Sequence, residues 1–596
     1  MSKISNSVLN LVTSFSLLLL AYSLFILRGI QPEGYTANIY EQLPFDFYLA
    51  LLLCYLLACV LLLAYRKMSV VLLLLLVHIT VLIIPYMLGY VSIGRGEEFS
   101  YIGLAGQGSL CNLSGLSNLS PTGPLLVSAL ALVSGLKTSA LSYFLPVFFS
   151  IMFIIGMFLF YRIFMSREKL VLTAFLCSTI LYFGHFQTSA ASYYLTFCLV
   201  PLYLLVLRSA LSDKNRAMAV CLLFMIPLIP LAHPFIFAYL ACFSISLLFS
   251  SMMNPGFLHK ILNPSFLSSS APHFSGKKIP LFIFLSLTLG GFLLCAKYAP
   301  QFFGSFTSDI ILRAKMLLFA SLSRVPRTET GSLEFMQLLS FGYGKYYIPL
   351  ILIMINSVIV WQNRKRFCHH FVRRYPRFLV LYIVTFFMEL AFLLNPFIPY
   401  SPDLFANLSF IIFAQIPLLG YSLYIVFLRK GYTLGLCSAV LVLCLLWTLG
   451  FFTCFSSPYT NGVSEAISQN EVQGIQWLSG VKETSPYVMS SINQDESIIL
   501  PEPLGINSRM AELTGSSQKL LYASKNDSKG GISVEKAAEE PFYIVETTFS
   551  DALSSKVQGS NNASISTEEN VSKAQTDYPL YKVYDSLNIK IYKHIS

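Results

Sequence analysis

Two adjacent carboxylates are the clearest sign of chemistry in this sequence. Glu97 and Glu98 follow Gly94-Arg95-Gly96, a turn in which two glycines relax the backbone and Arg95 adds a positive charge. Carboxylates in such a turn can act as a general base or hold a divalent cation. We therefore treat Glu97 and Glu98 as candidate catalytic residues, and Glu97 as a candidate ligand of Mg²⁺ or Mn²⁺. The spacing leaves a solvated charged loop open as the alternative.

Basic side chains form a second group of candidates. Guanidinium and ammonium groups bind phosphate well, and the segment 299–345 carries several of them. With Arg95, the candidate phosphate-binding residues are Arg313, Lys315, Arg324 and Arg327. Two further candidates are His233 and Glu389. Glu389 lies inside an apolar run, where a carboxylate is costly and often functional, although a hydrogen-bonded structural group is the alternative. His233 precedes Pro234 at a helix end, where a polar capping role competes with ligand binding.

The composition indicates whether these residues belong to a soluble protein or to a membrane protein. The chain has 596 residues, of which 55% are hydrophobic and only 12% are charged. A soluble protein of this length needs a charged surface, and this chain has too few charges to form one. The composition therefore predicts a mainly α, polytopic transmembrane helical bundle in the lipid bilayer of the plasma membrane.

Apolar runs predict about thirteen membrane spans in residues 1–455. The predicted spans are 8–27, 47–65, 69–90, 141–161, 170–186, 190–208, 217–233, 235–252, 280–298, 346–361, 378–397, 408–428 and 432–454. The stretch 122–136 is too short to span, and we expect an interfacial helix there. The three outer loops are then 28–46, 91–140 and 299–345.

Charge asymmetry orients the bundle. Residues 456–596 hold 11 Lys and Arg against 17 Asp and Glu, which leaves 29 basic and 12 acidic residues, a net charge of +17, in residues 1–455. The basic clusters of this region fall on one side of the membrane, at Arg66-Lys67, Arg162 to Lys169, Arg208 to Arg216, Lys260 to Lys278, Arg364 to Arg377 and Arg429-Lys430. By the positive-inside rule this side is cytoplasmic. The N-terminus is predicted inside, the C-terminal region outside, and no nucleic-acid partner is expected.

The last part of the chain is predicted to form a separate domain. Residues 456–596 predict a small extracytoplasmic α/β domain, with an amphipathic helix at Val472–Leu478. Short alternating runs follow, and Tyr584–Tyr592 predicts a terminal hairpin. We expect this domain to dock an acceptor or to cap the bundle.

Several of these segments resemble the GT-C membrane glycosyltransferases, particularly polytopic members found in methanogenic archaea. The resemblance rests on Gly34-Tyr35 with Ile39-Tyr40, on the turn from Gly94 to Gly103, on Leu228 to Pro234, and on the terminal hairpin. Glu97 stands where the family has Asp, and Tyr101 stands where it has His. Glu97 keeps the charge on a longer side chain, whereas Tyr101 cannot replace a histidine base near neutral pH.

The resemblance implies transfer of a sugar from a polyprenyl-phosphate donor to a glycan, lipid or protein acceptor on the outer face of the membrane. An outer-loop carboxylate would deprotonate the acceptor hydroxyl or position it through a divalent cation. Basic side chains would stabilise the departing lipid phosphate. Two alternatives stay open: a diverged, non-enzymatic envelope membrane protein, and a lipid or solute transporter.

Overall fold

The fold is known from a computed structural model that describes part of the chain. The described residues are 6–30, 34–94, 122–165, 167–188, 192–211, 347–363, 402–429, 433–457, 464, 466–480, 487–490, 542–548, 580–586 and 589–594. The predicted spans 217–233, 235–252, 280–298 and 378–397 lie outside these ranges.

Four described helices are long and apolar enough to cross a membrane. They are α1 (Asn6–Gly29), α2 (Phe45–Tyr65), α7 (Thr138–Phe164) and α21 (Thr433–Cys454). The other apolar helices are α3 (Val70–Leu82), α9 (Ser192–Leu211), α17 (Tyr347–Gln362) and α20 (Pro402–Leu423), which continues into the π-helical turn η7 (Tyr424–Leu428). The prediction of a mainly helical membrane protein is confirmed, and the number of about thirteen spans stays a prediction.

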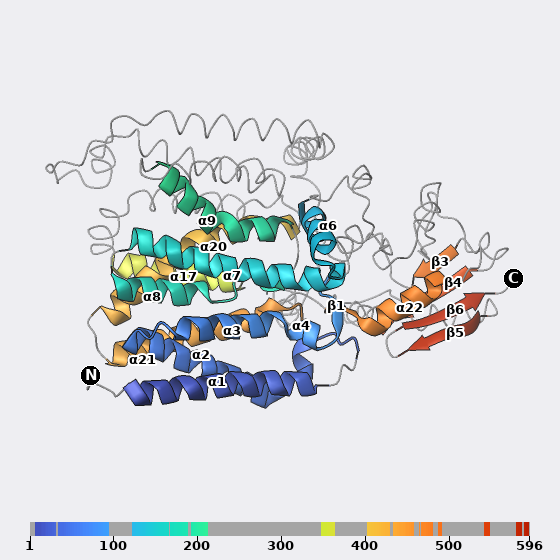
Figure 1. Cartoon of the computed structure of the whole chain (residues 1–596), viewed down its shortest axis with the longest axis horizontal. Helices are drawn as coiled ribbons and strands as arrows, with labels where there is room; N and C mark the ends of the chain where they lie inside the picture. Colours follow the sequence, from blue (N-terminus) through green and yellow to red (C-terminus); the bar gives the residue numbers. More distant parts are fainter. Residues whose placement is uncertain are drawn as a thin grey trace, which may run out of the picture.

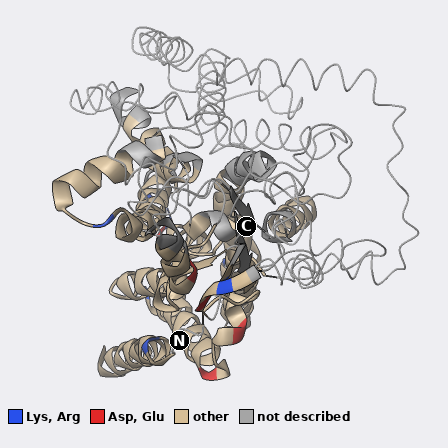
Figure 2. Ribbon diagram, turned by 90° about the vertical axis from the view of Figure 1, so that its right-hand side faces the viewer, with Lys and Arg blue, Asp and Glu red and all other residues tan. Residues whose placement is uncertain are grey.

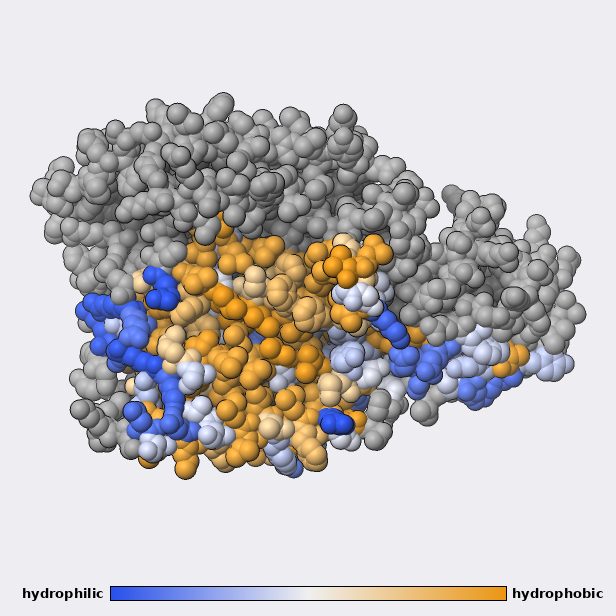
Figure 3. Space-filling view, in the orientation of Figure 1, coloured by the Kyte–Doolittle hydropathy of each residue, from blue (hydrophilic) through white to orange (hydrophobic). Residues whose placement is uncertain are grey.

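These helices lie side by side along the long axis of the molecule (Figure 1). On the face shown in Figure 3, the described helices form a hydrophobic band with hydrophilic residues at its ends. Seen along this axis, the described helices carry few charged residues (Figure 2). The band has the character expected of a surface that faces lipid tails, where charged side chains are expensive.

One end of the bundle gathers basic residues from several helices. Arg66, which follows α2, pairs with Glu168 at the start of α8 (Glu168–Ser178), with 2.7 Å between Nη1 and Oε2. Arg167 Nη1 donates to Tyr424 Oη over 3.1 Å, and Lys67 Nζ donates to Asn10 Oδ1. These contacts place the start of α1, the end of α2, the start of α8 and η7 at one level. This is the end that the positive-inside pattern predicts to be cytoplasmic.

Helix α8 stops halfway through the bundle. Its 11 residues rise about 16 Å, roughly half of what a membrane requires. Thr179, just after it, contacts the Tyr55 hydroxyl from the middle of α2, with 3.3 Å between the two oxygens. The chain then runs to the 3₁₀ turn η3 (Gly184–Thr188), and every residue from 171 to 184 is buried. A helix spanning 170–186 was therefore the wrong prediction for this segment.

The interruption is tolerated because protein groups satisfy the backbone that the helix leaves bare. Ser178 Oγ donates to Phe175 O over 2.7 Å, and Thr179 Oγ1 donates to Leu176 O over 2.8 Å. Tyr182 Oη donates to Cys177 O over 2.6 Å. Three hydroxyl side chains thus take the place of the next helical turn.

The predicted span 69–90 is also broken near its outer end. Helix α3 ends at Leu82, and the short α4 (Ile84–Met87) follows with Pro85 in its first turn. Proline lacks the backbone N–H that would continue the helical bonding. The chain then forms β1 (Tyr90–Ser92), a strand that was not predicted, at the boundary between the predicted span 69–90 and the predicted outer loop 91–140. The predicted interfacial stretch is helical as α6 (Thr122–Ser134), which packs against α7.

The C-terminal region contributes one helix and five strands to the described structure. They are β2 (Ile467–Ser468), α22 (Gln469–Gly480), β3 (Tyr487–Ser490), β4 (Phe542–Thr547), β5 (Leu580–Ser586) and β6 (Ile589–His594). The sheet order is β3-β4-β6-β5, and β5 and β6 form the expected antiparallel hairpin. Strand β3 was not predicted, and a domain boundary at 455/456 stays a prediction.

We predict that Gly420→Ala destabilises the bundle. A Cβ at Gly420 would lie 2.5 Å from the Cα of Ala174, so α20 and α8 would have to move apart. Overpacking of this kind typically costs about 1–3 kcal/mol of the free energy of unfolding. Thermal unfolding in detergent measures the effect, with Gly29→Ala as the control because a Cβ there meets nothing within 4 Å. Equal stability of the two variants would contradict the close approach of α8 and α20.

Candidate functional site

The site residues expected from the sequence lie outside the described residues. They are Arg95, Glu97, Glu98, Tyr101, His233, Arg313, Lys315, Arg324, Arg327 and Glu389. The structure does describe residues 34–94, and Gly94 is the first residue of the acidic turn. The frame that leads into this turn can therefore be built from its contacts.

This frame is a ring of three segments at the end of the bundle opposite the basic residues. We name it the outer collar and define it as residues 34–43, 89–94 and, in the C-terminal region, 464 and 466–471. It follows the end of α1, precedes α2, and receives the chain that leaves α21. In Figure 1 it lies between the helical bundle and the C-terminal sheet, where β1 is labelled.

Tyr40 ties the first collar segment to the end of α21. Its hydroxyl donates to Phe451 O over 2.6 Å and accepts from the backbone N–H of Phe455 over 3.0 Å. Its ring packs against those of Phe451, Phe452 and Phe455 at centroid distances of 5.6, 5.4 and 5.7 Å. Burial raises the pKa of Tyr40 well above its ordinary value, so the phenol stays neutral and keeps its proton to donate.

Tyr90 joins the first collar segment to β1. Its hydroxyl accepts from the Thr36 backbone N–H over 3.2 Å and from Gln42 Nε2 over 3.4 Å. Its carbonyl accepts from the Tyr143 hydroxyl of α7 over 2.6 Å. Burial is the main cause that raises the pKa of Tyr90, and the nearby Glu471 charge adds to it. Segments 54 residues apart in sequence are thus held together by a neutral phenol.

The C-terminal segment closes the collar. Tyr35 Oη donates to Ser464 O over 2.7 Å, and the Ser464 N–H donates to Ala37 O over 2.9 Å. Strand β2 pairs antiparallel with β1, with Tyr90 opposite Ser468 and Ser92 opposite Ile467. The tyrosines of the Gly34-Tyr35 and Ile39-Tyr40 motifs are therefore buried anchors of the collar.

The collar leads directly into the acidic turn. Ser92 Oγ donates to Gly94 O over 2.8 Å, which fixes the last described peptide before Arg95. The two carboxylates that the structure describes in the collar are hydrogen-bonded within it: Glu41 Oε1 accepts from Asn38 Nδ2 over 3.0 Å, and Glu471 Oε2 accepts from the Ser468 N–H over 2.9 Å. Nowhere in the described part of the chain do three His, Cys, Asp or Glu side chains come together to hold a metal ion.

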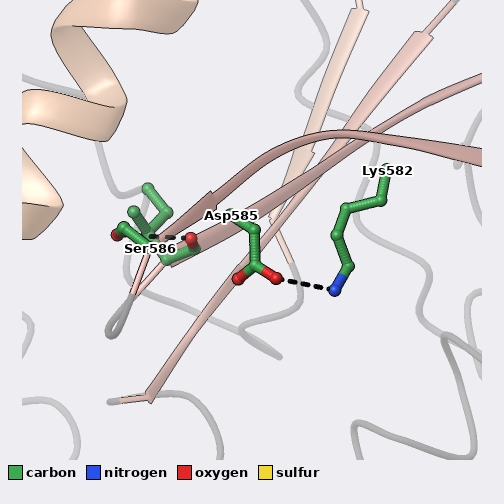
Figure 4. A network of polar contacts seen from close by, with 4 residues as sticks. Lys582, Asp585 and Ser586 are labelled. Atoms are coloured by element: carbon green, nitrogen blue, oxygen red, sulfur yellow. Dashed lines mark hydrogen bonds and ion pairs between the residues drawn. The ribbon is translucent and has the colours of Figure 1, made fainter.

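The terminal hairpin is linked to the collar through α22. A Cβ at Gly474 would lie 2.5 Å from Ile589 Cγ2, so the helix packs closely on β6. The Trp477 and Tyr584 rings lie 5.1 Å apart between centroids. On β5, Lys582 Nζ and Asp585 Oδ2 are 2.8 Å apart, and Ser586 Oγ donates to Ile589 O over 3.5 Å (Figure 4). The Lys582 bond lowers the pKa of Asp585, which makes this exposed carboxylate a local partner of lysine.

A second polar cluster lies inside the bundle, and the sequence analysis missed it. His78 of α3 is 1% exposed, and its Nε2 lies 2.7 Å from Ser150 Oγ of α7. Gln187 Nε2 of η3 lies 3.4 Å from the same ring nitrogen. A histidine within the run Val70–Leu82 is itself the signal, because ionisable residues within apolar spans are rare. The cluster joins three helices at the level where α8 is interrupted.

Comparisons with known proteins leave the family open. No protein family model matches the chain, and no curated protein matches it. Among solved structures, the crystal structure of ArnT from Cupriavidus metallidurans bound to undecaprenyl phosphate aligns with 89% of this chain and 99% of its own. The sequence identity is 10% and the TM-score is 0.43. This likeness is too distant to assign a fold family or an activity to the chain.

We predict that Tyr40→Phe weakens the collar. The substitution removes the acceptor of the Phe455 N–H and the donor to Phe451 O, and both backbone groups are buried. Leaving such groups without partners costs about 1–3 kcal/mol of the free energy of unfolding. Thermal unfolding in detergent tests this against Tyr22→Phe, since Tyr22 is 48% exposed and should change stability little. A Tyr40→Phe protein as stable as wild type would show that these hydrogen bonds do not contribute to stability.

We also predict energetic coupling between His78 and Ser150. In a double-mutant cycle, His78→Leu and Ser150→Ala should show a coupling energy of about 0.5–1.5 kcal/mol, because each removes the same interhelical hydrogen bond. The matched control pairs His78→Leu with Ser142→Ala, whose hydroxyl donates to Ser139 O within α7 instead. Additive effects in both cycles would show that the His78–Ser150 contact contributes no stability.

Proposed function

We propose that this chain is a GT-C-like membrane glycosyltransferase that moves a sugar from a polyprenyl-phosphate donor to an acceptor at the outer face of the membrane. One observation carries the proposal. Two parts of the chain that carry or lead into the resembling segments, Gly34–Tyr40 and the strand that ends just before Gly94, meet in one collar through Thr36 and Tyr90. Motif segments that are distant in sequence but adjacent in space are typical of parts of one site.

The proposed chemistry assigns each group a separate task. Glu97 accepts the proton of the acceptor hydroxyl, with Glu98 beside it, and the hydroxyl oxygen then attacks the anomeric carbon of the sugar. The bond between that carbon and the phosphate oxygen breaks, and polyprenyl phosphate departs. Cationic side chains, namely Arg95, Arg313, Lys315, Arg324 and Arg327, stabilise the phosphate charge as it develops. A protein, lipid or glycan would serve as the acceptor.

A transporter is the second candidate, and the interruption of α8 is the observation that favours it. Transporters often bind substrate where a helix breaks near the membrane midplane, and α8 ends level with the middle of α2. His78 adds a polar group at this break. The broken segment is fully packed, however, and its backbone carbonyls accept from its own hydroxyl side chains. The packing favours a structural role for the break.

The decisive experiment is a transfer assay. We expect purified wild type to release polyprenyl phosphate from at least one radiolabelled polyprenyl-phosphate sugar, tested with and without Mg²⁺ or Mn²⁺. Glu97→Gln should abolish transfer while thermal unfolding stays unchanged, because the amide cannot take up the acceptor proton. Loss of a positioned general base typically lowers the rate about 10²–10⁴-fold.

The matched control is Glu168→Gln, an exposed carboxylate at the opposite end of the bundle that pairs with Arg66. It should retain full activity. Full activity in Glu97→Gln would remove Glu97 from the mechanism. A well-folded wild type that neither binds nor turns over any donor would overturn the transferase. Donor movement across vesicles without sugar transfer would favour the transporter, and neither activity would favour a non-enzymatic envelope protein.

A further inference from the structure

We infer that the segment from Ser464 to Glu471 is a positioning element of the proposed transferase site, with Glu471 as its central residue. This inference rests on the proposed function. It goes further by giving the C-terminal region a task in the reaction: that region holds the backbone from which the acidic turn departs.

Strand β1 depends on partners outside itself. It has three residues, and a strand this short gains its order from the groups that pair with it. The partner strand is β2, and the Gln469 N–H extends the contact by donating to Gly89 O over 3.3 Å. The first C-terminal elements thus supply a large part of the order of β1.

Strand β2 is in turn fixed by a capping box at the start of α22. The Ser468 N–H and Oγ both donate to Glu471 Oε2, over 2.9 and 3.2 Å, and the Glu471 N–H donates to Ser468 Oγ over 3.3 Å. Serine followed by glutamate three residues later is the sequence signature of such a box. Glu471 is 1% exposed, and a buried carboxylate is tolerated only with such hydrogen bonds. The helix N-terminus also favours its negative charge.

Glu97, the candidate base, is joined to β1 by only a few residues of chain. Ser92 Oγ holds the Gly94 carbonyl, and Glu97 follows only three residues later. Consecutive Cα atoms are 3.8 Å apart, so a connection of three residues reaches at most about 11 Å. A displacement of about 1 Å at a reacting group can lower a rate by about 10²-fold. Release of β1 is therefore expected to lower turnover without altering any reacting side chain.

The same helix connects the collar to the C-terminal sheet. Gly474 and Trp477 of α22 pack on the terminal hairpin through Ile589 and Tyr584. An acceptor that binds the sheet would thus be held at a fixed place relative to the acidic turn. This gives the C-terminal region a direct mechanical connection to catalysis.

The test compares Glu471→Ala with Glu471→Gln in the full-length protein. Alanine removes both bonds to Ser468, whereas the glutamine Oε1 can still accept both. In Glu471→Ala we expect hydrogen exchange to be about tenfold faster in peptides covering 88–94 and 464–472. The kcat for sugar transfer should fall about tenfold or more, with a smaller change in the donor KM. Glu471→Gln should restore both the slow exchange and the turnover.

Glu168→Gln is the matched control, because this exposed carboxylate pairs with Arg66 at the end of the bundle opposite the collar. It should leave exchange in the two peptides and kcat unchanged. If Glu471→Ala loosens β1 without lowering kcat, or leaves its exchange unchanged, the positioning role is overturned. A Glu471→Gln variant that stays inactive would overturn the positioning role as well. A wild type without any transfer activity would overturn the proposed function itself, while the exchange data would still decide whether β2 holds β1.

Discussion

The constraint on which the described structure depends is that no backbone polar group can be left without a partner inside a membrane. Helix α8 meets this constraint at a break, where Ser178, Thr179 and Tyr182 bond the last helical carbonyls. The break in turn requires neighbours that come very close. A Cβ at Gly450 of α21 would lie 2.6 Å from Leu181 O, so only glycine admits the non-helical chain there. The position of α21, and hence of the residues that leave it, follows from this contact.

Tyrosine hydroxyls connect the end of α21 to the segments of the outer collar. Tyr40 holds the end of α21, Tyr90 holds the segment before α2, and Tyr35 holds Ser464. A tyrosine suits this boundary because its ring packs in an apolar layer while its hydroxyl bonds backbone groups at the polar end. The Gly34-Tyr35 and Ile39-Tyr40 motifs are thus explained by support of the collar, without a part in bond making. Part of the resemblance to a glycosyltransferase family therefore comes from residues that stabilise the collar.

The sequence predicted what depends on apolar length and missed what depends on contacts between distant segments. Runs of apolar residues correctly predicted α1, α2, α7, α9 and α21, because burial in lipid requires only enough nonpolar residues in a row. The break in α8 was missed because its residues are as apolar as those of a helix, and the hydroxyls that permit it look ordinary. Strand β1 was missed because its partner lies far along the chain, and a three-residue strand has no periodicity of its own. The C-terminal hairpin was found because its partners are adjacent in sequence. Whether the expected site residues converge stays a prediction, since they lie outside the described residues.

Charge imposes a further condition on the proposed site. The collar is held by neutral phenols, hydroxyls, amides and backbone groups, together with Glu41 and Glu471, whose carboxylates accept hydrogen bonds. In the described helical region, the basic residues near this end are Arg28 at the end of α1 and Lys137 before α7. A departing lipid phosphate needs positive charge within a few ångströms, since charge–charge attraction weakens quickly in a hydrated interface. The collar supplies order to the acidic turn but little of this charge. The proposed transferase would therefore need Arg95 of the turn and the basic residues of 299–345 to supply the positive charge that the collar lacks.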